Sequence, residues 1–594
     1  MTHITHYAMQ NMPDDFLLQV MKPGRYIGSE WNSSRKDFAA ARIKFALCFP
    51  DLYEVGMSNL GLRILYGILN NLSDVACERV FSCASDMEKI LRQQKQEIFS
   101  LESGRALKEF EFLGFSLGFE LGYTNVLNIL DLGNIPLKSS LRDSSYPLVI
   151  GGGPCSFNPE PMHEFFDFFC IGEAEEAILE IIDFYRLNQQ AYRSQNLSKE
   201  ELLSGFSQIE GVYVPSLYTV KYYPSGEIEE FKPKKTGLPL KVKKRFVRDL
   251  DAAYFPMEWL VPYIQIIHDR VALEIMRGCP NGCRFCQARW QYYPLRTRSP
   301  EKLLGMAAKL YASTGYEELS LLGLSVSDYP KIKDLTCGLI NLFKPKGISL
   351  SLPSVTSRPG VGSLSSIIAT VKKTGLTFAP EAGSQRLRGI LNKNFQEDEF
   401  LQILQEAYST GYQHVKLYFM IGLPFEEQID LDAIIDLAVR ASELKRKINR
   451  SPAQVNISIN TLIPKPHTAF QWFGMEGIES IRQKQHYLRS RNKNKRLKID
   501  FHNLEMSFLE GVFSRGDRRL SEVILRAYEL GARFDAWSDN FEFLKWQEAF
   551  TECGIDAGFY LKPRSKDLAL PWDFIDVGIS KDVLLTEFNK TVAR

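Results

Sequence analysis

Apolar residues in the first third of the chain fall in short continuous runs that alternate with segments of helical spacing. The runs have the length of buried strands, and they are 43–49, 112–117, 147–150 and 166–171. The segments of helical spacing are 57–69, 87–97, 123–130 and 175–185. This alternation predicts an α/β fold with a Rossmann-like, doubly wound parallel sheet over residues 41–190, with ligands bound beyond the carboxyl ends of the strands.

The same alternation returns later in the chain, after a connector at 191–265 where short strand-like runs mix with proline and lysine. Its predicted strands are 271–276, 318–322, 348–353, 376–379, 413–420 and 455–462. Six strand–helix units over 266–475 predict a partial (β/α)6 TIM-like barrel, with its chemistry at the carboxyl ends of the strands. Residues 1–40 are predicted to form an N-terminal arm, and 476–594 a helical extension with helices at 510–530 and 537–553.

Composition narrows the class of protein without identifying it. The 594 residues are 45% hydrophobic and 24% charged, with a net charge of +1, which is typical of a multidomain globular protein. There is no apolar run of about 18 residues, so we expect no membrane partner. Ten cysteines are scattered and only three cluster, which favours reduced thiols and a cytoplasmic location over a disulfide framework.

The three clustered cysteines are the strongest chemical signal. Cys279, Cys283 and Cys286 follow the predicted strand 271–276, and Gly278, Pro280 and Gly282 lie among them. Three thiolates on one tight loop can hold three corners of a cubane [4Fe–4S] cluster and leave the fourth iron open. Three unconnected cysteines and a zinc site are the alternatives; zinc prefers paired C-x2-C units and a fourth ligand, and the sequence has no second pair.

This array, with Phe285 before its last cysteine, resembles the signature of radical SAM enzymes. The resemblance implies that the amino and carboxylate groups of S-adenosylmethionine (SAM) chelate the open iron. It also implies that one-electron reduction cleaves SAM to a 5′-deoxyadenosyl radical, so that a flavodoxin- or ferredoxin-type reductant is expected as a partner.

Later segments resemble the SAM-binding motifs of that family. Segment 322–328 occupies the place of the family's Gly-Gly-Glu contact to the SAM amino group, but it has one glycine and no glutamate, so Ser325 or Asp328 is expected to make this contact. Segment 380–386 resembles the ribose and carboxylate motif, and segment 420–426 the adenine motif. The resemblance implies that SAM lies across Phe285, Ser325, Asp328, Glu381, Ser384, Arg386 and Gly422.

Each of these motifs also has an ordinary structural interpretation. Glu381 and Arg386 could form a surface ion pair, and segment 420–426 could be a plain turn from strand to helix. His467 in the loop after the sixth predicted strand could be catalytic, although a packed loop histidine is the more common case.

The predicted N-terminal sheet resembles the cobalamin-binding domain that precedes many radical SAM barrels. That domain carries D-x-H-x-x-G after its first strand; here Asp51, Tyr53 and Gly56 keep the frame, but tyrosine replaces the histidine that ligates cobalt. Ser116, Gly151 and Gly152 stand where contacts to the cobalamin nucleotide tail are expected. Two interpretations stay open: cobalamin bound with no imidazole on its lower face, or a domain that has lost the cofactor.

The whole layout resembles an uncharacterised B12-binding radical SAM family, which implies cobalamin-assisted methyl transfer to an unidentified substrate. Sulfur insertion of the methylthiotransferase kind is one alternative; it requires a second cluster, and Cys48, Cys77 and Cys83 lack the usual motifs. A non-catalytic Fe–S sensor or assembly protein is another. The basic run 486–498 could contact an RNA or nucleotide substrate, or it could be a solvated surface.

Overall fold

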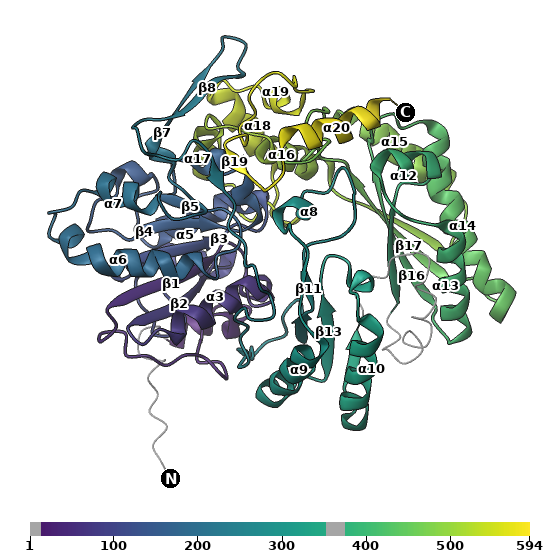
Figure 1. The fold of residues 1–594 in the computed structure, drawn as a ribbon, viewed down its shortest axis with the longest axis horizontal. Helices are drawn as coiled ribbons and strands as arrows, with labels where there is room; N and C mark the ends of the chain where they lie inside the picture. Colours follow the sequence, from purple (N-terminus) through teal and green to yellow (C-terminus); the bar gives the residue numbers. More distant parts are fainter. Residues whose placement is uncertain (1–13, 352–374, 594) are drawn as a thin grey trace.

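A six-stranded sheet occupies the N-terminal part of the computed structural model, which describes residues 14–351 and 375–593 (Figure 1). Its strands are β1 (Ile43–Phe49), β2 (Val75–Phe81), β3 (Phe112–Ser116), β4 (Leu148–Gly152), β5 (Phe168–Cys170) and β6 (Val212–Tyr213). The order is β2-β1-β3-β4-β5-β6; the first five run parallel, and β6 pairs antiparallel with β5. The order reverses between β1 and β3, where doubly wound sheets bind ligands.

The predicted doubly wound fold is therefore confirmed, with one strand that the sequence analysis missed. Strand β2 is buried along its whole length, yet it contains Glu78 and Arg79. Arg79 pairs with the buried carboxylates of Glu30 and Glu102, both at 2.6 Å. These two charges interrupt the apolar run by which a parallel strand is usually recognised.

The helices of this domain are α3 (Leu60–Asn71), α4 (Ser85–Gln94), α5 (Tyr123–Leu132), α6 (Ala177–Arg193) and α7 (Lys199–Phe206). After them a hairpin of β7 (Tyr218–Tyr222) and β8 (Ile228–Pro233) projects from the top of the molecule in Figure 1. Helix α7 and β6 both lie in the segment predicted as a connector, and β6 extends the N-terminal sheet.

Two parallel arcs of strands form the central domain. One arc contains β10 (Val271–Glu274), β13 (Glu318–Leu322) and β14 (Ser349–Ser351). The other contains β15 (Leu376–Glu381), β16 (His414–Ile421), β17 (Gln454–Thr461) and β18 (Leu497–Phe501). Helices α9 (Pro300–Thr314), α10 (Ile332–Phe343), α12 (Gln385–Leu391), α13 (Glu397–Ser409), α14 (Gln428–Asn449) and α15 (Ile478–Arg491) surround them.

All six predicted barrel strands are present, and the partial-barrel prediction is confirmed. Residues 352 and 353 of the predicted third strand lie outside the described residues, as do 1–13 of the predicted arm. Strand β18 is an additional strand that pairs with β17, in a region predicted to belong to the helical extension. Its residues alternate in burial, but the preceding run of lysine and arginine obscured this pattern.

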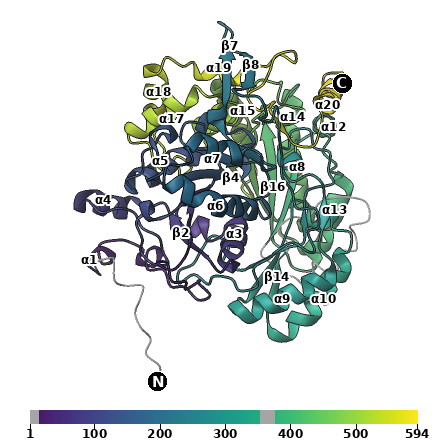
Figure 2. The same ribbon diagram turned by 60° about the vertical axis from the view of Figure 1, so that its left-hand side comes forward.

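The C-terminal region is helical and packs against both other domains (Figures 1 and 2). Its elements are α16 (Leu504–Ser514), α17 (Leu520–Glu529), α18 (Phe543–Glu552), α19 (Ala557–Leu561), β19 (Ile575–Asp576) and α20 (Lys581–Val592). The single helix predicted over 510–530 is wrong because the chain turns after Ser514. There the buried Arg515 donates to four backbone carbonyls at 2.8–3.3 Å.

Helices α16, α17 and α18 share one apolar core with the N-terminal sheet. In Figure 2 α17 lies beside α5, and α20 lies on the barrel side of the molecule. Within residues 14–351 and 375–593, none of the helices has the length and apolar character needed to cross a membrane.

Candidate functional site

The three clustered cysteines lie on one loop that is closed at its base by a pair of short strands. Strands β11 (Met276–Arg277) and β12 (Arg296–Thr297) pair antiparallel, so residues 278–295 form a loop above them. Cys283 is buried, and Cys279 and Cys286 are half-buried. The Cys286 N–H donates to the Cys283 carbonyl at 3.4 Å, which turns this end of the loop back on itself.

The three thiols share one loop but do not meet at one point. Among the described residues, no three His, Cys, Asp or Glu side chains converge as they would on one metal ion. In a cubane each thiolate binds a different iron, so the thiols need to share a loop but need not meet at a point. Burial raises the pKa of Cys283 to about 12 and also raises that of Cys286, so metal binding would have to displace protons from both.

The C-terminal end of α12 and the helix α20 hold this loop in place. The Asn392 side chain donates to the Gly282 carbonyl at 2.9 Å, and the Arg284 N–H donates to the Leu391 carbonyl at 3.0 Å. The buried Arg284 guanidinium donates to the Ile390 carbonyl at 2.8 Å and pairs with Glu587 of α20 at 2.9 Å. The cysteine loop is thus fixed by backbone contacts from the barrel and by one ion pair from the C-terminal region.

Phe285 packs among apolar residues at the carboxyl ends of three barrel strands. It contacts a cluster that includes Ala382 after β15, Leu423 after β16 and Leu462 after β17. These are the positions at which barrels of this kind place their chemistry. Sequence analysis predicted Phe285 as a SAM contact, and the structure brings it together with the strand ends predicted to bind the rest of SAM.

Glu381 at the end of β15 forms an ion pair beside the cysteines. Its carboxylate accepts from Lys393 at 3.2 Å, and both side chains are about four-fifths buried, at 18% exposure. Glu381 has a positive φ of 70°, a conformation that costs a non-glycine residue about 1–3 kcal/mol and that concentrates at functional sites. Burial raises its pKa, while the Lys393 ammonium opposes that effect.

Lys393 was missed by the sequence analysis. Its charge acts on both Cys283 and Cys286, opposing the effect of burial on the pKa of these thiols. It follows Asn392, which contacts the cysteine loop, but it lies outside every motif that resembled a known family. A search limited to motif residues could not have found it.

Ser325 and Asp328 lie close to the cysteine loop, as the sequence analysis predicted for SAM contacts. The Ser325 hydroxyl donates to Asp328 at 2.6 Å. Asn281, between the first two cysteines, donates to Asp328 at 3.0 Å and lies 3.4 Å from the Cys279 sulfur. The second strand end and the loop are therefore joined by a polar network in which Asn281 is an addition to the prediction.

Ser384 and Arg386 are occupied elsewhere. Ser384 caps α12 by accepting from the Leu387 N–H at 3.1 Å, and both side chains bind Asp430 of α14. Arg386 also donates to the Phe425 carbonyl at 2.8 Å. The prediction that they contact the SAM carboxylate would require this ion pair to open, whereas Lys393 already lies beside the thiols.

Gly422 and His467 have structural partners as well. Gly422 has a positive φ of 77°, and its N–H donates to the buried Glu426 carboxylate at 3.0 Å. His467 is buried, and its Nε2 lies 2.9 Å from the Phe157 carbonyl. Burial lowers the pKa of His467 to about 4, so it is neutral near pH 7, as expected of a packed loop histidine.

A cavity of about 440 Å³ lies between the N-terminal sheet and the barrel. Its lining is mostly apolar and comes from β1, β3 and β4, from α3 and α6, and from the barrel segments around β11 and β13. Ser116, Gly151 and Gly152, which were predicted as cobalamin contacts, all line it. The cavity reaches Gly278, the residue before Cys279, so it adjoins the cysteine loop.

None of the other predicted cobalamin residues lines this cavity. Asp51 accepts from the Trp537 indole at 2.9 Å. Tyr53 is 1% exposed and donates to Glu30 at 2.8 Å. A Cβ at Gly56 would lie 2.2 Å from the Phe81 ring, so this glycine makes room for a core side chain and not for a ligand.

Comparison with known proteins agrees with this arrangement. The family described as "Radical SAM proteins, N-terminal" matches residues 61–215, and "Radical SAM superfamily" matches 273–438. The uncharacterized protein MJ0966 of Methanocaldococcus jannaschii is 27% identical over 81% of this chain and 90% of its own length. The tRNA-2-methylthio-N(6)-dimethylallyladenosine synthase of Pelotomaculum thermopropionicum is 30% identical over 28% of this chain, and the match spans only 39% of that enzyme.

Two solved structures are similar at low identity. The cobalamin-dependent S-adenosylmethionine radical enzyme OxsB aligns with a TM-score of 0.46 and 13% identity, over 93% of this chain and 79% of its own. The radical S-adenosylmethionine methyltransferase TsrM from Kitasatospora setae aligns with a TM-score of 0.45 and 13% identity, over 71% and 73%.

Proposed function

Because this chain is a radical SAM protein with an N-terminal domain of the matching kind, we propose that it is an enzyme that transfers a methyl group to a substrate with the help of cobalamin. The observation that carries the proposal is the cavity of about 440 Å³, which joins the N-terminal sheet to the residue preceding Cys279. A corrinoid held there would adjoin a cluster held by the three cysteines.

The residues present fit a [4Fe–4S] cluster. Cys279, Cys283 and Cys286 share one loop, that loop is fixed by Arg284 and Asn392, and no fourth thiol belongs to it. Lys393, which is about four-fifths buried and pairs with Glu381, places one positive charge beside the cysteines. Three thiolates would leave the fourth iron open, and SAM would bind there.

The residues around the loop also fit SAM. Glu381 would accept hydrogen bonds from the ribose hydroxyls, Lys393 would pair with the carboxylate, and Ser325 with Asp328 would meet the amino group. Phe285 and the apolar strand-end residues would exclude water from the sulfonium. Gly422, whose Cβ-free backbone closes the β16 turn, would flank the adenine.

The cavity fits the nucleotide tail of cobalamin. A Cβ at Gly152 would meet nothing closer than Cys170 at 3.9 Å, so the missing side chain leaves open space. The lining is mostly apolar, as an aromatic base requires. Because Tyr53 points into a buried ion-pair network, we propose that cobalt receives no side-chain ligand from the D-x-H-x-x-G position.

Bound together, these groups would supply reductive cleavage of SAM and a transferable methyl group. This chain's own residues would then hold both cofactors at a fixed separation and exclude water between them. We further propose that a flavodoxin- or ferredoxin-type protein delivers the electron.

The structure does not favour sulfur insertion. Cys48 and Cys77 lie within the neighbouring strands β1 and β2, where each is buried, and burial raises the pKa of both thiols. They are therefore part of a sheet and not of a second cluster loop.

Contact with RNA or a nucleotide at 486–498 stays a proposal without a specific observation in its favour. Within that run Arg491 pairs with Asp432 at 2.8 Å, and Arg489 stacks on Phe501 at 4.6 Å.

Three measurements test the proposal. Anaerobic reconstitution should give about four irons per chain, and Cys279→Ala should abolish this, whereas Cys337→Ala on the exposed face of α10 should not. Reduced protein with SAM should release 5′-deoxyadenosine. Hydroxocobalamin should bind with a changed visible spectrum. Zinc in place of iron would refute the enzyme assignment. An intact cluster that releases no 5′-deoxyadenosine would favour a sensor. A protein that does not bind hydroxocobalamin would refute the proposed methyl transfer.

A further inference from the structure

The base of the cysteine loop carries two arginines that lie directly opposite each other. In the β11–β12 pair Met276 faces Thr297 and Arg277 faces Arg296. The loop between them, 278–295, contains all three cysteines. Any group that fixes these two arginines therefore fixes the position of the loop.

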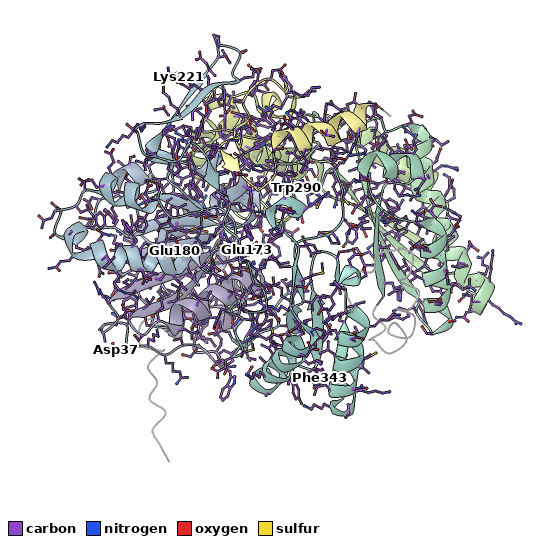
Figure 3. All side chains as sticks on the ribbon, in the orientation of Figure 1. Asp37, Glu173, Glu180, Lys221, Trp290 and Phe343 are labelled. Atoms are coloured by element: carbon purple, nitrogen blue, oxygen red, sulfur yellow. The ribbon has the colours of Figure 1, made fainter. Side chains whose placement is uncertain are left out.

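Both arginines bind the same carboxylate of the N-terminal domain. Glu173 follows β5, and Figure 3 labels it where that domain meets the barrel. Arg296 binds it with two hydrogen bonds, at 2.8 and 2.7 Å, and Arg277 reaches it at 2.9 Å. The Val247 N–H donates to it at 2.8 Å. A carboxylate with paired guanidinium contacts has a fixed orientation as well as a fixed position.

The charged groups around this contact are paired with one another and shielded from water. Glu274 binds Arg277 at 2.9 and 3.0 Å, and Glu175 binds Arg277 at 2.6 Å. Glu173, Glu274, Arg277 and Arg296 are each only 7–8% exposed. Burial alone would raise the pKa of Glu173, but the contacts from Arg296 and Arg277 hold it below its ordinary value, so the carboxylate is ionised.

The same residues form part of the cavity wall. Glu173, Glu175, Glu274 and Arg277 all line the cavity, and so does Gly278 at the start of the cysteine loop. A ligand in the cavity would therefore touch the ion-pair network, and the network holds the loop. A nearby ion pair lacks this property: Arg245 binds Glu180 at 2.7 Å, but Glu180, in the first turn of α6, has a side chain that is 46% exposed and does not line the cavity.

We propose that Glu173 is a positioning residue that fixes the cysteine loop against the N-terminal sheet, and that through it the cavity ligand and the cluster strengthen each other's binding. The identity of the two ligands rests on the proposed function; the positioning of the loop does not. Because binding free energies are linked reciprocally, the cluster should raise the affinity for cobalamin by the same factor by which cobalamin stabilises the cluster.

The first experiment needs no cofactor. In iron-free protein the rate at which the loop thiols react with a disulfide reagent reports how firmly the loop is held, and the exposed Cys337 gives an internal reference. We expect Glu173→Gln to raise the loop-thiol rate at least tenfold relative to Cys337. Glu180→Gln should leave it unchanged. Equal rates in Glu173→Gln and the wild type would overturn the positioning role.

The second experiment measures the linkage. The affinity for hydroxocobalamin is compared between iron-free and reconstituted protein. In the wild type and in Glu180→Gln we expect the cluster to increase this affinity at least fivefold. In Glu173→Gln we expect an increase of less than twofold. A wild-type ratio of one, with both cofactors bound, would overturn the linkage. Failure of the wild type to bind iron or corrinoid would count against the proposed function and also against this linkage, leaving the thiol result to decide the positioning.

If Glu173→Gln does not fold, Arg296→Lys is the substitute, because it keeps the charge and loses the paired contact. It should raise the loop-thiol rate in the same direction, by at least threefold. An unchanged rate in a folded Arg296→Lys protein would refute the role of the paired contact.

Discussion

Gly152 offers the sharpest test of what the cavity binds. The residue lies at the end of β4 and lines the cavity, and its missing Cβ faces open space with Cys170 no closer than 3.9 Å. Replacing it with leucine would therefore put a side chain into the cavity without forcing the backbone to move. Glycine within a strand costs roughly 0.5–1 kcal/mol relative to alanine, so the folded state should not be destabilised.

The expected effect falls on the ligand. Four added carbon atoms would overlap a group that fills the cavity, and overpacking of this kind costs about 1–3 kcal/mol. Converted to affinity, this is about a 5- to 150-fold increase in the dissociation constant for hydroxocobalamin. The assay is a titration followed by visible absorption, with thermal unfolding measured on the same samples.

Gly118→Leu is the matched control. A Cβ at Gly118 has nothing within 4 Å, and the residue follows β3 at the same edge of the sheet, but it is not among the residues that line the cavity. Its affinity for hydroxocobalamin should match the wild type. If Gly152→Leu bound cobalamin as tightly as Gly118→Leu, the corrinoid would not enter this cavity, and the cofactor assignment built on it would be wrong.

Three other predictions follow from side chains with fully described partners. Tyr53→His would restore the D-x-H-x-x-G motif but should give no nitrogen coupling in the cobalt(II) EPR spectrum; nitrogen coupling would show that the segment can reach the ligand. The substitution should cost about 1–3 kcal/mol of stability, because the buried Glu30 loses one donor and keeps those of Arg79. Burial lowers the pKa of His467 from 6.5 to about 4, so as the pH falls the unfolded chain binds a proton at this residue before the folded chain does. The folded state therefore keeps its full stability above pH 6.5 and loses part of it between pH 6.5 and 4. The urea-unfolding free energy should therefore drop by about 2–3 kcal/mol more between pH 7 and 4.5 in the wild type than in His467→Gln, and parallel curves would contradict the buried neutral state. Arg284→Ala, which removes the pair with Glu587 and two backbone contacts, should speed iron loss to a chelator severalfold, whereas an unchanged rate would mean that α20 does not hold the loop.

The sequence predicted the parts of the fold that rely on continuous apolar runs. Within the described residues, all six strands in the barrel prediction end within two residues of those observed, because helices of clear periodicity lie between them. Strand β2 was missed because Glu78 and Arg79 interrupt its apolar run. The burial of Arg79 depends on Glu30 and Glu102, which lie in other segments of the chain. When a buried charge is paired with a residue from another segment, the neighbouring residues in the sequence do not show that it is buried.

The same distinction holds for the site. The cysteines could be predicted because their spacing is itself the signal, and Phe285 because it lies within that spacing. Lys393 could not, since its role depends on where α12 ends relative to the loop. Ser384 is a different case: its motif predicts a ligand contact, and in the structure its hydroxyl caps α12.

The core shared by the N-terminal sheet and the C-terminal helices has a consequence for how the chain folds during synthesis. The contact from Thr124 to Asp535 spans 411 residues, and the one from Asp51 to Trp537 spans 486. At roughly 5–20 residues per second, a ribosome needs about 20–80 s to make the 411 residues that separate Thr124 from Asp535. For that time one face of the sheet has no partner, so the nascent protein presents apolar surface to chaperones long before its last core residues exist.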